Sequence, residues 1–218
     1  ADGTLREQGL TLPTGAAGAL LAKLELPPRT TQAEAFDQIG RALDANAPDA
    51  PLVRFCALLA EAGLLHDVEI AVPGDASRAA QLLAVREAVP AAVNRRVSLA
   101  KAVDNRIEKT AADMVVPFDQ ISEMLDRYHR AFASRGLDLA VWGHLSDGNL
   151  HPNLIPRGYD DVLKGREAIL ALGQDVMRLG GAPLAEHGVG RNQTKQRLLR
   201  ELYGEQGIEQ MQAVKRAL

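Results

Sequence analysis

The sequence has little of what marks a disulfide-bonded, membrane-embedded or nucleic-acid-binding protein. Its 218 residues include one cysteine, Cys56, so no internal disulfide can form, and we expect a buried thiol in a cytoplasmic, reducing compartment. No apolar run reaches the roughly 18 residues that a membrane span needs. Lys and Arg number 25 against 28 Asp and Glu, for a net charge of -3. We therefore expect no nucleic-acid partner and no anionic membrane surface as a partner.

Both ends of the sequence lack the features of a natural chain terminus. The first ten residues, "ADGTLREQGL", contain no Met and no basic and apolar regions of a signal peptide. The last eight, "MQAVKRAL", stop inside a helical pattern without a cap. We therefore expect residues 1–218 to be one domain of a longer protein.

Strand-like and helix-like patterns follow one another over the whole chain. Hydrophobic residues make up 46% of it, which is enough to bury a core. Continuous or alternating apolar runs predict strands at 18–26, 67–72, 113–117, 137–145 and 149–156, with 51–59 either a strand or a short helix. Apolar residues three to four positions apart predict helices at 31–45, 75–93, 118–136, 160–179 and from 192 onward. The polar stretch 94–112 is predicted to be an excursion that a partner or ligand orders.

A few residues set the expected helix ends and the fold class. Thr31 and Asp75 are predicted N-caps, and Pro90 is predicted to end or kink its helix. At least one tight hairpin joins two of the strands, which excludes a purely parallel sheet. The pattern favours an α+β fold with helices packed on an antiparallel sheet, and a split βαβ, ferredoxin-like unit is the simplest version.

The stretch "GHLSDGNLHP", residues 143–152, contains two of the five histidines. Asp147-Gly148 is a strong signal for a two-residue type I′ turn. With that turn His144 faces His151 directly, and alternation places both imidazoles on a polar face while the leucines point into the core. Pro152 indicates that the second strand lies at an edge of the sheet or soon leaves it.

Two imidazoles at this separation can bind one divalent cation, for which Zn, Mn or Fe are all suitable. Without a third ligand, ordinary solvated or hydrogen-bonded histidines explain the pair as well. Glu186, in "LAEHGVGRNQTKQ", supplies a third donor and would leave one position open for substrate, as in catalytic zinc sites. His187 would point to the opposite face of an extended segment and could act as a general base. The following "GVGR" could be no more than the entry to a helix.

Together, "GHLSDGNLHPNLIP" and "AEHGVGRNQTK" resemble the C-terminal domain of FAD-linked oxidases, a group that includes D-lactate dehydrogenases, glycolate oxidase subunits and D-2-hydroxyglutarate dehydrogenases. Earlier segments such as "DMVVPFDQISEML" extend the resemblance over nearly the whole chain. It implies an α+β, ferredoxin-like cap over FAD that a separate, preceding domain binds. It also implies oxidation of a small 2-hydroxy acid by hydride transfer to FAD, with the isolated fragment inactive.

The resemblance further implies roles for single residues. The metal ligands would be His144, His151 and Glu186, the catalytic base would be His187, and the substrate contacts would be Arg86 and Asn149. The sequence departs from some relatives, which carry Lys-Tyr-Asp before the Val-Pro segment, because it has Ala111 and Ala112 there. Two functions of other classes stay open: a stand-alone metal-dependent hydrolase, and a non-catalytic binding or subunit-interface module.

Overall fold

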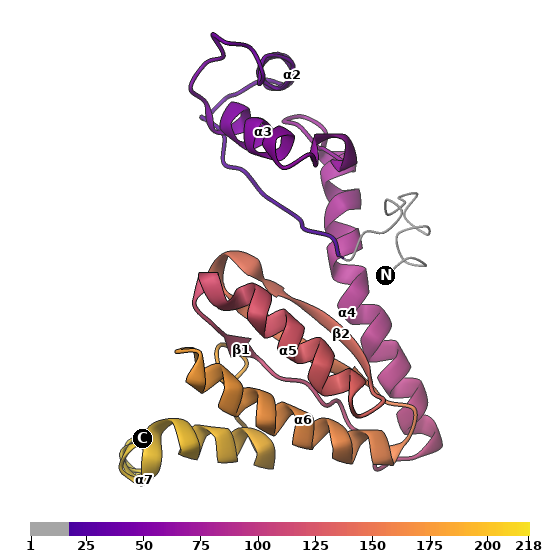
Figure 1. Cartoon of the computed structure of the whole chain (residues 1–218), viewed down its shortest axis with the longest axis vertical. Helices are drawn as coiled ribbons and strands as arrows, with labels where there is room; N and C mark the ends of the chain where they lie inside the picture. Colours follow the sequence, from indigo (N-terminus) through magenta and orange to yellow (C-terminus); the bar gives the residue numbers. More distant parts are fainter. Residues whose placement is uncertain (1–17) are drawn as a thin grey trace. The chain divides into compact units, whose positions relative to one another are not determined.

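A computed structural model describes residues 18–218, which fall into two compact units (Figure 1). Unit 1 ends at Ala92, and unit 2 runs from Val93 to Leu218. Helix α4 (Ala76–Val103) supplies residues to both units. No helix within residues 18–218 combines the length and the apolar character that crossing a bilayer requires.

Unit 1 is helical over the residues that the structure describes. It contains α2 (Gln32–Gly40), α3 (Pro51–Glu61), the 3-10 turn η1 (Leu65–Asp67) and the first part of α4. Thr31 caps α2 as predicted, in a reciprocal pair with Glu34 in which each side chain accepts from the other residue's backbone N–H. Asp75 caps α4 as predicted, because its Oδ1 accepts from the backbone N–H of Arg78 at 3.0 Å. Cys56 is buried in the small core, also as predicted.

Three predictions for residues 18–112 are wrong. Residues 18–26 and 67–72 form no strand, because an apolar run becomes a strand only where another strand offers hydrogen bonds. Residues 94–103 are not a polar excursion but the continuation of α4, whose Val93 and Val97 are buried. The helix does not end at Pro90 but passes through it, because burial of the next turns stabilises the helix although the proline removes one backbone hydrogen bond. The alternative prediction of a kink at Pro90 stays a prediction.

Unit 2 is built on a three-stranded antiparallel sheet with the strand order β1-β3-β2. The strands are β1 (Met114–Val115), β2 (Asp138–His144) and β3 (Asn149–Ile155). Helices α5 (Ile121–Ala133) and α6 (Tyr159–Arg178) lie side by side on the sheet (Figure 1). Their apolar side chains form the main core with Leu150 and Leu154 of β3. The α+β class and the antiparallel sheet are thereby confirmed.

The remaining face and edge of the sheet are covered by other elements of unit 2. The last part of α4 packs through Val93 and Val97 against Trp142 and Ile155. After α6, residues 182–184 run beside β1 but make only isolated bridges to it. The described residues therefore hold three strands and not the four of a ferredoxin-like sheet, so that topology stays a prediction. Helix α7 (Gln193–Ala217) follows and packs on α6.

The position of Pro152 differs from the prediction. Its strand, β3, is the central strand and not an edge. The C=O of Pro152 accepts from the N–H of Ala112, and in an extended strand the N–H and C=O of one residue point to the same side. The missing N–H of Pro152 therefore faces the short β1 side, and the pairing with β2 loses no donor.

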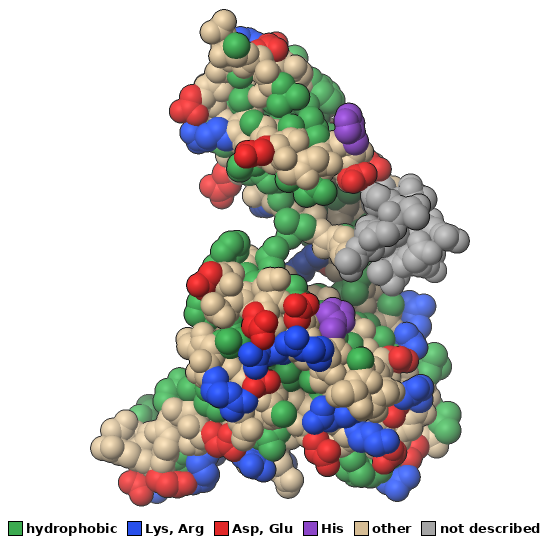
Figure 2. Space-filling model, in the orientation of Figure 1, with side chains coloured by type: hydrophobic (Ala, Val, Ile, Leu, Met, Phe, Trp, Pro, Cys, Tyr) green, Lys and Arg blue, Asp and Glu red, His purple; other side chains and the backbone are tan. Residues whose placement is uncertain are grey.

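Acidic and basic side chains are mixed over the face of unit 2 that carries α5 and α6 (Figure 2). Among the ion pairs of these helices are Arg127 with Glu123, Lys164 with Asp160, and Arg157 with Asp161. Exposed pairs of this kind contribute little to stability. The Asp161 side chain differs because it is only 12% exposed.

Asp161 gives the fold a predictable dependence on pH. Its carboxylate accepts from the Nε and the backbone N–H of Arg157, both at 3.0 Å. The side-chain hydrogen bond lowers the pKa of Asp161 below its ordinary 3.8, more than burial raises it. A carboxylate whose pKa is lower in the folded than in the unfolded protein stabilises the fold. This stabilisation is fully present above the unfolded-state pKa and is lost as the pH falls through the folded-state pKa.

We therefore expect Asp161→Asn to reduce the free energy of unfolding by about 1–2 kcal/mol at neutral pH, and by progressively less as the pH falls below the ordinary pKa of 3.8. Urea unfolding of both proteins over this pH range measures the difference. A difference that does not change with pH would contradict the assignment.

Candidate metal centre

The hairpin between β2 and β3 holds His144 and His151 in a register that differs from the predicted one. His144 pairs with Asn149 rather than with His151. The predicted turn was wrong because Leu145–Asp147 form a 3-10 turn and Gly148 alone has a positive φ, of 67°. The pairing is shifted by two residues, and side chains alternate with a period of two, so both histidines stay on one face. Their ring centroids are 6.0 Å apart, with the planes nearly perpendicular.

Gly148 fastens this hairpin to β1. Its N–H donates to the C=O of Leu145, and its own C=O accepts from the N–H of Val116, both at 3.1 Å. A Cβ at this position would lie 2.1 Å from the carbonyl oxygen of Val116. Glycine is therefore required both by the left-handed backbone and by the close approach. The contact joins the residue just after the end of β1 to the turn between the two histidine-bearing strands.

The two histidines differ in exposure. The His151 side chain is 5% exposed, whereas that of His144 is 41% exposed. Every residue of β3 is buried, and α4 covers part of the histidine face. The histidine face was predicted to be polar, and at His151 it is also buried, so this imidazole is a buried polar group that needs partners.

A bend after α6 brings Glu186 and His187 to the hairpin. The backbone N–H groups of these two residues donate to Oδ2 of Asp113 at 2.7 and 2.6 Å, and the N–H of Ala185 donates to the C=O of Asp113. The prediction that Glu186 and His187 point to opposite faces is wrong, because the segment is bent and not extended. Glu186 Oε1 lies 3.2 Å from His187 Nε2.

The glycine-containing turn that follows is held by the first turns of α7. Lys195 Nζ donates to the C=O of Gly188 at 3.0 Å, and Gln196 Nε2 donates to the C=O of Gly190 at 2.9 Å. Asn192 caps the helix by accepting from the N–H of Lys195. The "GVGR" segment is thus the entry to a helix, and it steadies the chain just after His187.

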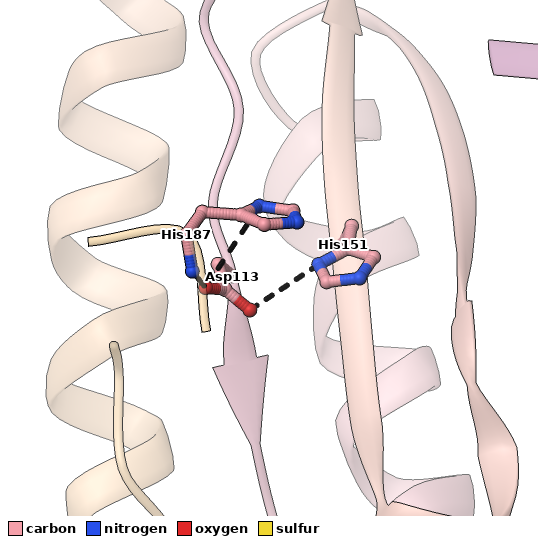
Figure 3. Close-up of side chains that lie close together, drawn as sticks. All are labelled: Asp113, His151 and His187. Atoms are coloured by element: carbon pink, nitrogen blue, oxygen red, sulfur yellow. Dashed lines mark hydrogen bonds and ion pairs between the residues drawn. The ribbon is translucent and has the colours of Figure 1, made fainter. Parts of the chain in front are cut away.

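Three imidazoles meet at one carboxylate oxygen. The Nε2 atoms of His144 and His151 each lie 3.4 Å from Glu186 Oε1, and Nε2 of His187 lies 3.2 Å from it. The rings of His151 and His187 stack with centroids 4.6 Å apart. The other nitrogen of His151, Nδ1, faces Asp113 Oδ1 at 3.4 Å (Figure 3).

This donor set fits a single metal ion. The ligand atoms of His144, His151 and Glu186 all lie within 4.8 Å of one another. A tetrahedral ion with bonds of about 2.05 Å has ligand–ligand edges of about 3.3 Å, close to the two separations of 3.4 Å. Two nitrogens and one carboxylate would leave a position open, as in catalytic sites.

The electrostatics of the buried pair also suit a metal. Burial is the largest influence on His151 and lowers its pKa, and its net pKa stays below the ordinary value although Asp113 and Glu186 act to raise it. Burial would raise the pKa of Asp113, but the backbone N–H groups of His187 and Glu186 and the nearby imidazoles lower it overall. A neutral imidazole beside an ionised carboxylate is the state in which histidine ligates a metal.

Comparison with protein families matches residues 7–218 to the FAD linked oxidases, C-terminal domain. The chain belongs to this family.

Relatives of this FAD-linked oxidase C-terminal domain include three larger proteins. The chain is 31% identical to "Glycolate oxidase subunit GlcD" of Bacillus subtilis over 107 residues. These aligned residues make up 48% of this chain and 22% of the relative. The chain is 32% identical over 105 residues to "D-lactate dehydrogenase" of Archaeoglobus fulgidus, 47% of this chain and 22% of the relative. It is 27% identical over 110 residues to "Probable D-lactate dehydrogenase, mitochondrial" of Danio rerio, 50% of this chain and 22% of the relative. Each match therefore covers about a fifth of the relative's length.

The structure brings four of the six predicted site residues of this FAD-linked oxidase domain into one cluster: His144, His151, Glu186 and His187. Asn149 lies two residues before His151 on the same face of β3, and its buried Oδ1 accepts no hydrogen bond within the described part of the chain. Arg86 is an exposed residue of α4 in unit 1, whereas the cluster is in unit 2. The functional roles of all six residues stay predictions.

Sequence reasoning missed Asp113, whose side chain is only 2% exposed. A signal was present, because Asp113 is the one charged residue in the otherwise apolar stretch "AADMVVP". A carboxylate in an apolar strand is costly to bury without partners. Its presence therefore points to a polar cluster beside β1.

Proposed function

We propose that this domain forms the metal- and substrate-binding part of the active site of a longer FAD-dependent oxidoreductase, which oxidises a small 2-hydroxy acid to the 2-oxo acid. The observation that carries the proposal is the approach of three imidazole Nε2 atoms to Glu186 Oε1 at 3.2–3.4 Å. Membership of the FAD-linked oxidase family supports the flavin. Two relatives are named for glycolate and D-lactate, and both are 2-hydroxy acids.

His144, His151 and Glu186 would hold a divalent cation, for which Zn, Mn and Fe are all compatible with two nitrogen ligands and one oxygen ligand. When bound, such a cation would polarise the substrate hydroxyl and lower its pKa. His151 is fixed in the sheet, while His144 and Glu186 are 41% and 46% exposed. The partly open pair would face the substrate, and the buried histidine would anchor the site.

His187 would take the hydroxyl proton at Nε2. This atom lies beside Glu186 Oε1 at 3.2 Å, and the side chain is 53% exposed, so a substrate can reach it. The other ring nitrogen, Nδ1, faces Asp113 Oδ2 at 3.8 Å. With Glu186 engaged by the cation, a proton held on Nδ1 would leave the lone pair on Nε2 free to accept the hydroxyl proton. FAD, held mainly by a separate N-terminal domain, would accept the hydride from the substrate Cα.

Two further residues would bind the substrate itself. The guanidinium of Arg86 would hold the carboxylate through a bidentate contact. Asn149 would offer its amide, whose buried Oδ1 accepts no hydrogen bond from the described residues. Correct orientation of hydroxyl and carboxylate supplies much of the rate of such a reaction.

The test uses the full-length protein that contains this domain, under anaerobic conditions. Mixing it with D-lactate, glycolate or D-2-hydroxyglutarate should bleach the flavin absorbance with at least one of the three. Removal of metal with a chelator should slow the bleaching, and added Zn²⁺ or Mn²⁺ should restore it. Bleaching by none of the three acids would contradict the substrate class, and bleaching that is unchanged after chelation would contradict the metal's role.

A further inference from the structure

Asp113 is a buried carboxylate whose polar contacts all lead to the candidate metal centre. Its side chain is 2% exposed, and burial of an ionised group is costly unless it is paired and hydrogen-bonded. Its contacts are the backbone N–H groups of Glu186 and His187 and the imidazoles of His151 and His187. None of these groups lies on β1 itself, so the carboxylate connects separate parts of the chain.

The two oxygens of this carboxylate have different partners. Oδ2 accepts two short hydrogen bonds, at 2.7 Å from Glu186 N and 2.6 Å from His187 N. Oδ1 faces His151 Nδ1 at 3.4 Å, and within the described residues neither of these two atoms has a hydrogen-bond partner. A proton on Nδ1 directed at Oδ1 would leave the lone pair of His151 on Nε2, which is the atom that faces Glu186.

Asp113, His151 and His187 could also be taken as a metal-binding group, because their ligand atoms lie within 4.8 Å of one another. Two observations argue against this. Two backbone N–H groups already point at Oδ2, and a cation there would face the positive ends of both dipoles. Asp113 is also almost fully buried, whereas Glu186 and His144 are open to a substrate.

We propose that Asp113 is a positioning residue of the metal centre: it holds the Glu186–His187 segment through the backbone and sets the tautomer of His151, without binding the metal. The inference rests on the metal site of the proposed function. Histidine ligands commonly donate their second N–H to a carboxylate in this way, and removal of that partner typically costs 10- to 100-fold in metal affinity.

Asp113→Asn tests the proposal with almost no change of shape. The two backbone donors should keep the amide oxygen at the Oδ2 position, so the amide NH₂ would face His151 Nδ1. The imidazole would then have to accept at Nδ1 and carry its proton on Nε2, the nitrogen that must ligate the metal.

Three measurements on the 218-residue chain follow from this. Competition with a chromogenic chelator should show a Zn²⁺ affinity about 10- to 100-fold lower in Asp113→Asn, with one ion per chain in the wild type. Long-range ¹⁵N–¹H NMR of the metal-free proteins should show the His151 proton moving from Nδ1 to Nε2. The amides of Glu186 and His187 should exchange faster in the variant, because a neutral amide oxygen accepts more weakly than a carboxylate.

Asp161→Asn is the matched control, because Asp161 on α6 is also a largely buried carboxylate that accepts a backbone N–H, from Arg157 just before the helix. It should lower stability and leave Zn²⁺ affinity unchanged. The proposal is overturned if Asp113→Asn binds Zn²⁺ like the wild type. It is also overturned if the wild type binds two ions and the variant one, since Asp113 would then be a ligand.

If Asp113→Asn does not fold, measurements on the wild type alone test the proposed role of Asp113. A His151 proton on Nε2 in the metal-free wild type, or unprotected amides at Glu186 and His187, overturns the proposal. A wild type that binds none of Zn²⁺, Mn²⁺ and Fe²⁺ overturns the metal centre of the proposed function. The tautomer and amide-exchange measurements would still show whether Asp113 holds this segment, so the two failures can be told apart.

Discussion

Replacement of Glu186 by glutamine is expected to lower the affinity of the chain for Zn²⁺ by more than about 100-fold, beyond the range found for residues that only support a ligand. The carboxylate oxygen of Glu186 lies 3.4 Å from Nε2 of both His144 and His151. A neutral amide at this position would retain the shape and lose the negative charge that offsets the cation. Chelator competition with the purified chain measures the affinity, and circular dichroism checks that the fold is unchanged.

Glu123→Gln is the control for this experiment. The Glu123 side chain on α5 is 42% exposed, close to the 46% of Glu186, and it accepts from Arg127 at 2.7 Å. Loss of its charge should leave Zn²⁺ affinity as in the wild type. Equal affinity of Glu186→Gln and wild type would place the cation on other residues and contradict the proposed centre.

Local signals in the sequence predicted the elements that local interactions form. Thr31 caps the start of α2 as predicted, and its capping box with Glu34 is a local interaction of the same kind. The apolar stripe of Ile121, Leu125, Tyr128 and Phe132 predicts the helix over 118–136, and α5 buries all of these residues except Leu125, which is partly buried. In each case neighbouring residues along the chain settle the structure, so no distant partner had to be known.

Elements that depend on distant partners could not be predicted in this way. The prediction of the hairpin register was wrong because the turn depends on a hydrogen bond from the N–H of Val116 to the C=O of Gly148. Val116 lies more than thirty positions earlier in the sequence. The apolar stretch 18–26 has no strand to pair with among residues 18–218 and stays irregular. An apolar pattern alone does not tell a strand from such a segment.

The sequence predicts which residues form the candidate metal centre but not which residue holds them in place. His144, His151 and Glu186 were named from donor chemistry and from the family resemblance, and the structure brings them together. The sequence marks Asp113 as a lone carboxylate in an apolar stretch but does not show its partners, because its hydrogen bonds reach Glu186 and His187, 73 and 74 positions away. No spacing rule covers such a distance, and only the fold brings the groups into contact.

His187→Gln in the full-length flavin-dependent protein is expected to reduce turnover of the 2-hydroxy acid by about 10²- to 10⁴-fold, the usual contribution of a general base. Zn²⁺ affinity should stay within about threefold of the wild type, because the proposed ligands are untouched. Nε2 of His187 lies as close to Glu186 Oε1 as do the nitrogens of the two proposed ligands. Geometry alone therefore does not distinguish a base from a third histidine ligand. Turnover and Zn²⁺ affinity, measured together, distinguish the two.

Two readouts distinguish a base at His187 from a ligand or a structural residue. Added imidazole should restore part of the lost rate, because it can take the hydroxyl proton from solution. His144→Gln should behave in the opposite way to His187→Gln. It should lose much of its Zn²⁺ affinity, and added imidazole should not restore its turnover. If His187→Gln also loses more than tenfold in Zn²⁺ affinity, His187 is a metal ligand, and the base must be another group that contacts the substrate.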